Sequence, residues 1–239
     1  MRCPSFIETF RATCVPVLAM AGLLLNGLVA QAAAPAAPLP APSVDTVKAP
    51  AAEQTAVLAG GCFWGVQGVF EHLNGVHRVL AGYAGGARNT AHYALVGTGS
   101  TGHAESVQIT YDPQLVSYGE ILQVFFTVAH DPTQLNKQGP DVGSQYRSEI
   151  FYLDDMQRQV ASAYIAQLTK AAVFRAPIAT RVDAFTGFFP AEDYHQDFLL
   201  QHPDNPYIAY NDLPKIQNFQ KLLSGLYRGR PAALALASR

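Results

Sequence analysis

The sequence predicts a two-layer α+β domain in which helices cover one face of a β-sheet, and three observations support this prediction. Strand-like and helix-like stretches follow one another over residues 55–153 in the order β-α-β-β-α-β. Hydrophobic residues make up 49% of the 239 residues, which is enough to fill a core. The chain has three cysteines, too few for a fold held together by disulfides.

The first half of this pattern is a strand, a helix and a second strand. Residues 55–59 form a short apolar run that two glycines end. Apolar residues then recur at the spacing of one helix face, and Gly75 ends this helix. These apolar residues are Val66, Val69, Phe70 and Leu73. Residues 76–83 predict the second strand.

The second half contains a strand, a helix and a fourth strand. Residues 104–111 show the alternation of a third strand. Ser117 and Glu120 form a capping box that opens an apolar helix continuing to Val128. Residues 146–153 predict the fourth strand. The complete order is the split β-α-β, or ferredoxin-like, arrangement, and it predicts a two-layer sandwich.

Further elements are predicted on the C-terminal side of this unit. Residues 160–168 have helical spacing, residues 178–185 predict a fifth strand, and residues 193–201 predict a helical stretch. Three prolines then break up the chain, and we make no fold prediction beyond Ala209. These prolines are Pro203, Pro206 and Pro214.

The N-terminus has the features of an export signal. Arg2 and Arg11 precede an apolar run over residues 15–25, and small residues follow as a cleavage site. We expect a signal peptide at 1–32 and a periplasmic protein that is not held in the membrane after cleavage. An uncleaved anchor is the alternative interpretation.

The rest of the chain divides into a linker, one domain and a tail. Residues 33–54 are rich in alanine and proline and predict an extended linker without packed structure. We assign residues 55–209 to a single domain and residues 210–239 to a C-terminal tail. The net charge of −2 offers no basic excess for binding nucleic acid.

Cys62 is the candidate nucleophile, and signal cleavage would leave it as the only cysteine. It lies between a predicted strand and a predicted helix, where the helix N-terminus favours a thiolate. Phe63 and Trp64 follow it and could hold an apolar group such as a methyl. The alternative is an inert cysteine buried in the core.

Glu105 is the candidate general acid. It shares the strand face of Val107 and Ile109, so apolar surroundings would raise its carboxyl pKa and keep the proton in place. The alternative is a glutamate at a strand end that reaches solvent.

The connections over residues 84–102 and 129–145 are longer than compact domains usually need, which favours a functional role. Tyr93, Asp141 and Tyr146 lie in or beside these connections. Tyrosine hydroxyls there could donate hydrogen bonds to an oxygen that develops charge. Taken one at a time, each of these residues is better explained by a structural role.

Other motifs predict no cofactor and no metal. Residues 97–102 match the pattern G-x-G-x-x-G, but a strand follows them where a dinucleotide site needs a helix. The histidines and cysteines lack zinc-binding or thioredoxin-type spacing. His103 could serve as a thiol base, or it could be a packed loop residue.

The motifs around Cys62 resemble those of peptide methionine sulfoxide reductase, type A. The similarity runs in order over residues 55–209. The shared motifs are Gly61-Cys-Phe-Trp-Gly65, Gly82-Tyr-Ala-Gly-Gly86, Thr101-Gly-His-Ala-Glu105, Tyr111-Asp-Pro113, His130-Asp-Pro132, Gln145-Tyr-Arg-Ser148 and Ala191-Glu-Asp-Tyr-His195.

This resemblance implies an activity and a set of site residues. The enzyme would reduce the S epimer of methionine sulfoxide, free or within proteins, to methionine. The resemblance makes Cys62 the nucleophile, which becomes a sulfenic acid, and Glu105 the proton donor to the sulfoxide oxygen. Other residues match the substrate pocket: Phe63 and Trp64 around the methyl, Tyr93 and Tyr146 as hydrogen-bond donors, and Asp141 as a polar pocket residue.

The chain departs from the family pattern in one respect. Many members carry resolving cysteines, whereas this chain has none after Cys62, and Gly97 stands where some relatives have a further cysteine. The sulfenic acid would therefore be reduced by an external thiol, either a thioredoxin-like protein or a small thiol.

Two competing functions use the same residues differently. A Cys-His hydrolase or acyltransferase would pair Cys62 with His103 or His195 as base. A tethered binding module would instead recognise exposed methionine or apolar side chains through Phe63 and Trp64.

Overall fold

The computed structural model describes residues 37–49 and 52–234. The predicted signal peptide lies outside the described residues. Within the described part of the chain, no helix combines the length and the apolar character needed to cross a membrane.

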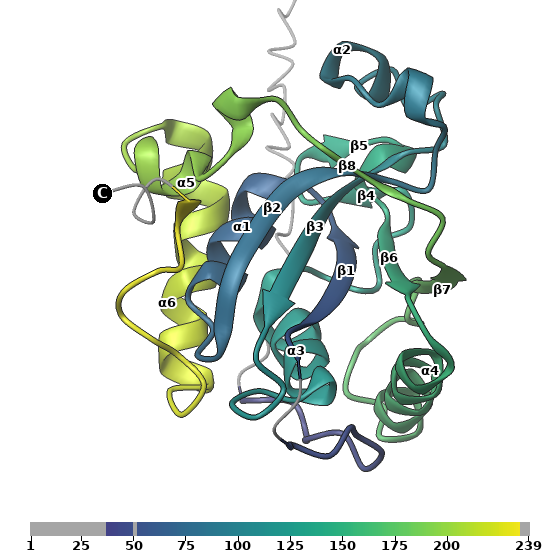
Figure 1. The fold of residues 1–239 in the computed structure, drawn as a ribbon, viewed down its shortest axis with the longest axis vertical. Coiled ribbons are helices and arrows are strands. Elements are labelled where there is room, and N and C mark those ends of the chain that lie inside the picture. The colour runs from purple at the N-terminus through teal and green to yellow at the C-terminus, as the bar shows by residue number, and fades with distance from the viewer. Residues whose placement is uncertain (1–36, 50–51, 235–239) are drawn as a thin grey trace, which may run out of the picture. The chain divides into compact units, whose positions relative to one another are not determined.

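The centre of the domain is a six-stranded, curled sheet (Figure 1). Its strands are β1 (Gln54–Gly60), β2 (Val76–Ala84), β3 (Ala104–Tyr111), β6 (Ser148–Tyr152), β7 (Arg181–Ala184) and β8 (Phe188–Pro190). Their order across the sheet is β7-β6-β1-β3-β2-β8, and all neighbours are antiparallel except β6 and β7. The four strands expected over residues 55–153 are therefore adjacent, and β7 and β8 extend the sheet at its two edges.

Helices bury most of their apolar side chains against one face of this sheet. The helices are α1 (Phe63–Glu71), α2 (Tyr93–Val96), α3 (Tyr118–Val124), α4 (Asp155–Lys170), α5 (Phe198–Gln201) and α6 (Leu213–Leu222). Val66 and Phe70 of α1 share one core cluster with Val107 and Ile109 of β3. A smaller cluster around Phe151 covers part of the opposite face. The sheet is therefore buried on more than the single face that the sequence predicted.

The predicted capping box at the start of α3 is confirmed. The Ser117 hydroxyl accepts a hydrogen bond from the Glu120 amide at 3.1 Å, and the Glu120 carboxylate accepts one from the Ser117 amide at 2.8 Å. Two amides of the first turn are satisfied in this way, which is why the helix begins here.

The two long connections are not structureless. The first contains α2, and the second contains a hairpin formed by β4 (Lys137–Gln138) and β5 (Asp141–Val142). A short 3-10 helix at Ser144–Tyr146 then precedes β6, so Tyr146 lies before the strand in which we expected it. The residues that these connections carry are thus held in defined places.

The expectation of an unpacked linker is wrong for its described part. Leu39 is buried in the main core, and the Tyr164 hydroxyl donates to the Pro40 carbonyl at 2.8 Å. The Asp45 carboxylate accepts from the Ser117 hydroxyl at 2.6 Å and from the Gly119 amide at 2.7 Å. Residues 37–49 contain no helix or strand, as predicted, but composition does not show that this segment packs against α3 and α4.

We expect Asp45→Ala to destabilise the protein by about 1–2 kcal/mol, because two donors at the N-terminus of α3 lose their acceptor. The midpoint of thermal unfolding measures this effect. Asp204→Ala removes an exposed carboxylate and serves as the matched control. Equal midpoints for the two variants would show that the linker does not support the fold.

The domain also continues beyond Ala209. Helix α6 packs against α1 (Figure 1), and its Phe219 side chain is fully buried. Pro214 lies in the first turn of α6, where the missing amide hydrogen costs nothing because that amide has no helical partner. A proline in the sequence predicts a break, but at the start of a helix it is compatible with the helix that follows.

Candidate active site

Cys62 is at the junction of β1 and α1, as predicted. It is the N-cap residue of α1 and carries a free thiol. Gly61 before it has a φ of 90°, a conformation that glycine adopts without strain, and it allows the chain to turn sharply into the helix. The cysteine is 8% exposed, so only a small part of it reaches solvent.

The expectation that Cys62 rests as a thiolate is wrong. Burial raises the pKa of the Cys62 thiol well above its usual value, and the charges of Glu105 and Asp212 raise it further. The Trp64 amide and the Lys215 ammonium lower it without reversing the shift. The resting residue is a neutral thiol, because desolvation outweighs the helix N-terminus.

Glu105 lies in β3 beneath the first turn of α1 and is 3% exposed. Its carboxyl Oε2 accepts a hydrogen bond from the Phe63 amide at 3.0 Å. Burial raises the pKa of Glu105 to about 8, although this hydrogen bond opposes the shift. The group is therefore mostly protonated at neutral pH, and its other oxygen can carry the proton.

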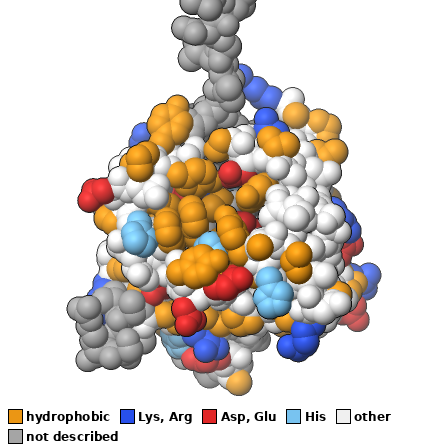
Figure 2. Space-filling model, turned by 90° about the horizontal axis from the view of Figure 1, so that it is seen from above, with side chains coloured by type: hydrophobic (Ala, Val, Ile, Leu, Met, Phe, Trp, Pro, Cys, Tyr) orange, Lys and Arg blue, Asp and Glu red, His pale blue; other side chains and the backbone are white. Residues whose placement is uncertain are grey.

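Aromatic rings form a wall beside the thiol. The Phe63 ring is buried, with its centroid 5.1 Å from that of His195. The Trp64 ring stacks on Phe198 at 3.8 Å and meets the edge of Tyr207 at 5.9 Å. Figure 2, seen from the end where α2 and β5 lie, shows hydrophobic side chains gathered on this side of the molecule, with acidic and histidine side chains among them.

The two long connections bring the remaining predicted residues into the electrostatic surroundings of Cys62. Burial raises the pKa of the Tyr146 hydroxyl, and the charges of Glu105 and Asp141 add to this effect. Burial likewise raises the pKa of Tyr93, again with Glu105 contributing. Both phenols remain neutral hydrogen-bond donors over the whole neutral range.

Asp141 is hydrogen-bonded to Tyr207, a residue outside the predicted site. Its carboxylate accepts a hydrogen bond from the Tyr207 hydroxyl. Burial raises the pKa of Asp141, and the hydrogen bond from Tyr207 and the charge of Lys215 oppose that shift. The carboxylate is thus linked to the C-terminal segment, beyond the loop that contains it.

Known proteins are similar to this chain in both sequence and fold. The family model described as peptide methionine sulfoxide reductase matches residues 54–225, well over half of the chain. The chain belongs to the peptide methionine sulfoxide reductase family. Reductase MsrA 2 of Mesorhizobium japonicum is 57% identical over 191 residues, which cover 80% of this chain and 98% of that protein. Reductase MsrA 2 of Synechocystis is 54% identical, over 72% of this chain and 80% of that protein.

Solved structures agree with this assignment. Mxr1 from Saccharomyces cerevisiae in reduced form has a TM-score of 0.58 and 31% identity, over 68% of this chain and 92% of that one. Methionine sulfoxide reductase A of Corynebacterium diphtheriae has a TM-score of 0.55 and 32% identity, over 71% and 85%. The mixed α/β fold is therefore that of the type A reductases, and the chain is an oxidoreductase that reduces methionine sulfoxide, a reaction of protein repair.

The two histidines considered as thiol bases each form a hydrogen bond with a group other than the thiol. His195 Nδ1 accepts a hydrogen bond from the Trp64 indole at 3.1 Å, and burial lowers the pKa of its ring. His103 is buried, and its Nε2 bonds to the Ala87 carbonyl at 3.0 Å. Since a carbonyl only accepts, that nitrogen donates its hydrogen.

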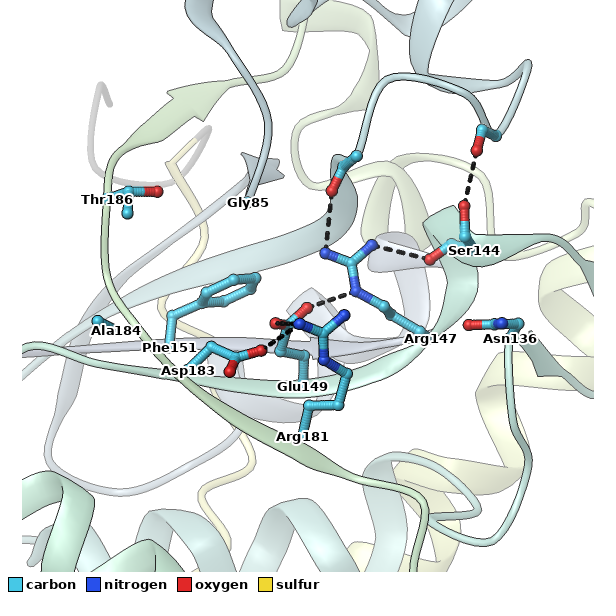
Figure 3. A pocket seen from close by; sticks show the side chains of 12 residues that line it. Gly85, Asn136, Ser144, Arg147, Glu149, Phe151, Arg181, Asp183, Ala184 and Thr186 are labelled. Atoms are coloured by element: carbon cyan, nitrogen blue, oxygen red, sulfur yellow. Dashed lines mark hydrogen bonds and ion pairs between the residues drawn. The ribbon is translucent and has the colours of Figure 1, made fainter.

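A hollow of about 540 Å³ is lined in part by charged side chains, and Cys62 is not among its lining residues (Figure 3). Arg147 forms a buried ion pair with Glu149 there. The same guanidinium donates to the carbonyls of Gly102 at 3.0 Å and Ser144 at 2.9 Å. Arg147 thus ties together the two connections that carry Tyr93 and Tyr146.

Sequence reasoning missed the contribution of the C-terminal segment. Tyr207, Asp212 and Lys215 all interact electrostatically with Cys62. Tyr207 lies at the end of the predicted domain, and the other two lie beyond Ala209, where the sequence led to no fold prediction. The three-residue spacing of Asp212 and Lys215 is a helical signal that was available. It went unused because Pro214 stands between them.

Proposed function

We propose that this reductase acts on the S epimer of methionine sulfoxide, free or within proteins, through a sulfenic acid on Cys62 that an external thiol then reduces. The single observation that carries the proposal is the buried Glu105 carboxyl group, which accepts a hydrogen bond from the amide of Phe63, the residue after the nucleophile, and whose pKa burial raises. An acid in this position can deliver a proton to an oxygen bound beside the thiol.

The first step is attack by the Cys62 sulfur on the sulfoxide sulfur. The sulfur–oxygen bond breaks, the oxygen passes to Cys62, and methionine leaves. Cys62 loses two electrons and becomes a sulfenic acid, while the substrate sulfur gains them. Glu105 protonates the oxygen as it gains negative charge, and the thiol proton restores the carboxyl group. Because Glu105 is neutral beforehand, its carboxyl group adds no negative charge that would oppose the thiolate as it forms.

The neighbouring side chains position the substrate for this step. Phe63 and the stacked Trp64 provide the apolar surface for the methyl group of the sulfoxide. The hydroxyls of Tyr93 and Tyr146 hold the sulfoxide oxygen near Glu105, with Asp141 as a polar neighbour. No metal or organic cofactor takes part in this scheme.

The second step needs a thiol from outside the domain. No cysteine follows Cys62 in the sequence, so an internal disulfide with the C-terminal segment cannot form. A thiolate attacks the Cys62 sulfenic acid, water leaves, and a mixed disulfide results. A second thiol then releases Cys62. The export signal predicted at residues 1–32 supports a thioredoxin-like protein or a small thiol of the periplasm as the donor.

We expect the enzyme to consume the S epimer of N-acetylmethionine sulfoxide and to leave the R epimer unchanged when dithiothreitol supplies the thiols. Chromatography that separates the two epimers measures this directly. A reaction without dithiothreitol is the control and stops after about one turnover, because Cys62 is not restored. Consumption of the R epimer at an equal rate would contradict the proposed specificity.

A further inference from the structure

A buried ion pair lies against the first turn of α1. The Lys215 ammonium donates to Asp212 Oδ1 at 3.0 Å, and the two side chains are 19% and 0% exposed. Both occupy the space that a glycine leaves open. If Gly65 carried a Cβ, that atom would be 2.9 Å from the Lys215 nitrogen and in collision with the Asp212 carboxylate. The pair is thus in contact with the helix turn that Cys62 caps.

The pair lies on the Cys62 side of α1. Gly65 is three residues after Cys62, and residues three apart lie on the same face of a helix. The C-terminal segment holds the pair in place because α6 packs on α1 (Figure 1). Through space, the Lys215 charge favours ionisation of Cys62, and the Asp212 charge opposes it.

Stability does not account for this pair. Two buried charges lose their hydration, and well-packed apolar side chains of similar size would hold two helices together as well or better. Asp212 Oδ2 is buried without a hydrogen-bond partner among the described residues. A buried oxygen left in this state costs free energy, so the arrangement points to a role for the charges themselves.

We propose that Lys215 is a positioning residue of the reaction, whose ammonium stabilises the Cys62 thiolate as it forms, and that Asp212 holds this ammonium against α1. The inference rests on the proposed function of Cys62. It gives the buried thiol a nearby positive charge that favours its ionisation.

Several other groups act on the Cys62 or Lys215 charge, and they must stay unchanged in any test. They come from strands β3 and β5, the loops and the C-terminal segment. They are Glu105, Asp141, Tyr93, Tyr146, Tyr207 and His130. None of these six groups is a cation at neutral pH. Among the groups that act on the charge of Cys62, the positive charge is therefore that of Lys215.

The test is the pH dependence of Cys62 alkylation by iodoacetamide, followed by mass spectrometry of the peptide that contains Cys62. It uses the full chain without methionine sulfoxide. We expect Lys215→Met to raise the apparent pKa of Cys62 by about one unit and to lower kcat/KM at pH 7 about tenfold. Lys215→Arg should restore both values. Lys221→Met, at an exposed position of the same helix, should change neither.

Asp212→Asn separates an electrostatic role from a structural one. The asparagine keeps an oxygen that can accept from Lys215 but removes the negative charge, so the apparent pKa of Cys62 should fall. Shifts of opposite sign for Lys215→Met and Asp212→Asn support the inference. Shifts of the same sign, or an unshifted profile for Lys215→Met, would overturn it.

The same data distinguish this inference from the proposed function. Opposite shifts in a protein whose Cys62 never reacts with methionine sulfoxide would remove the proposed function and leave the ionisation role. If Lys215→Met leaves the pH profile of alkylation unshifted and still reduces the sulfoxide at the full rate, the ionisation role is wrong and the proposed function stands.

Discussion

Cys62→Ser is expected to abolish reduction of methionine sulfoxide, with a loss of at least about 10³-fold in kcat, because a serine hydroxyl at neutral pH is a far weaker nucleophile than a cysteine sulfur. The swap changes one atom in a residue that is 8% exposed, so the fold should remain. Loss of methionine formation, followed by chromatography, is the measurement.

Binding provides the control for this variant. The walls of the site, Phe63 and Trp64, are unchanged, so Cys62→Ser should still bind methionine sulfoxide, as titration of Trp64 fluorescence would show. Trp64 is the only tryptophan of the chain, which makes the signal specific. Retained turnover in Cys62→Ser would show that Cys62 is not the nucleophile.

Glu105→Gln is expected to slow the first step by about 10²- to 10⁴-fold, the usual contribution of a general acid. Glutamine keeps the shape and can still accept from the Phe63 amide, but it has no acidic proton. In the unmodified enzyme the acid form is present below the pKa of about 8 and is lost above it. The rate of the acid-assisted step should therefore fall as the pH rises through this value.

Rapid-quench measurement of methionine formed in the first turnover, over pH 6 to about 10, checks this prediction. The Glu105→Gln variant should lose the decline near pH 8. Glu53→Gln removes a carboxylate whose side chain is 58% exposed, and this variant should show the same rate at each pH as the unmodified enzyme. A full rate for Glu105→Gln across neutral pH would show that another group supplies the proton.

Local signals in the sequence predicted the central elements of the fold well. The alternation over residues 104–111 corresponds to β3, and the capping box marks the start of α3. Both are properties of a few consecutive residues. Docking of the linker and of α6 depends on contacts between segments far apart in the chain, and a single sequence does not display those contacts. For this reason the sequence does not predict that Asp45 accepts hydrogen bonds at the start of α3, or that Pro214 begins a helix.

The site shows the same division. A cysteine at a helix start, followed by two aromatic residues, is a local pattern, and the structure has Cys62, Phe63 and Trp64 in that arrangement. The ionisation state of Cys62 depends on burial and on charges from β3 and the C-terminal segment. The helix N-terminus alone predicted a thiolate, whereas the complete surroundings give a thiol.

The most direct test of the central claim is the mass of the Cys62 peptide after the enzyme reacts with one equivalent of methionine S-sulfoxide in the absence of any thiol. Our account predicts about one methionine released per chain and one oxygen gained at Cys62, trapped by dimedone as a sulfenic acid. Release of methionine with Cys62 unmodified would contradict it.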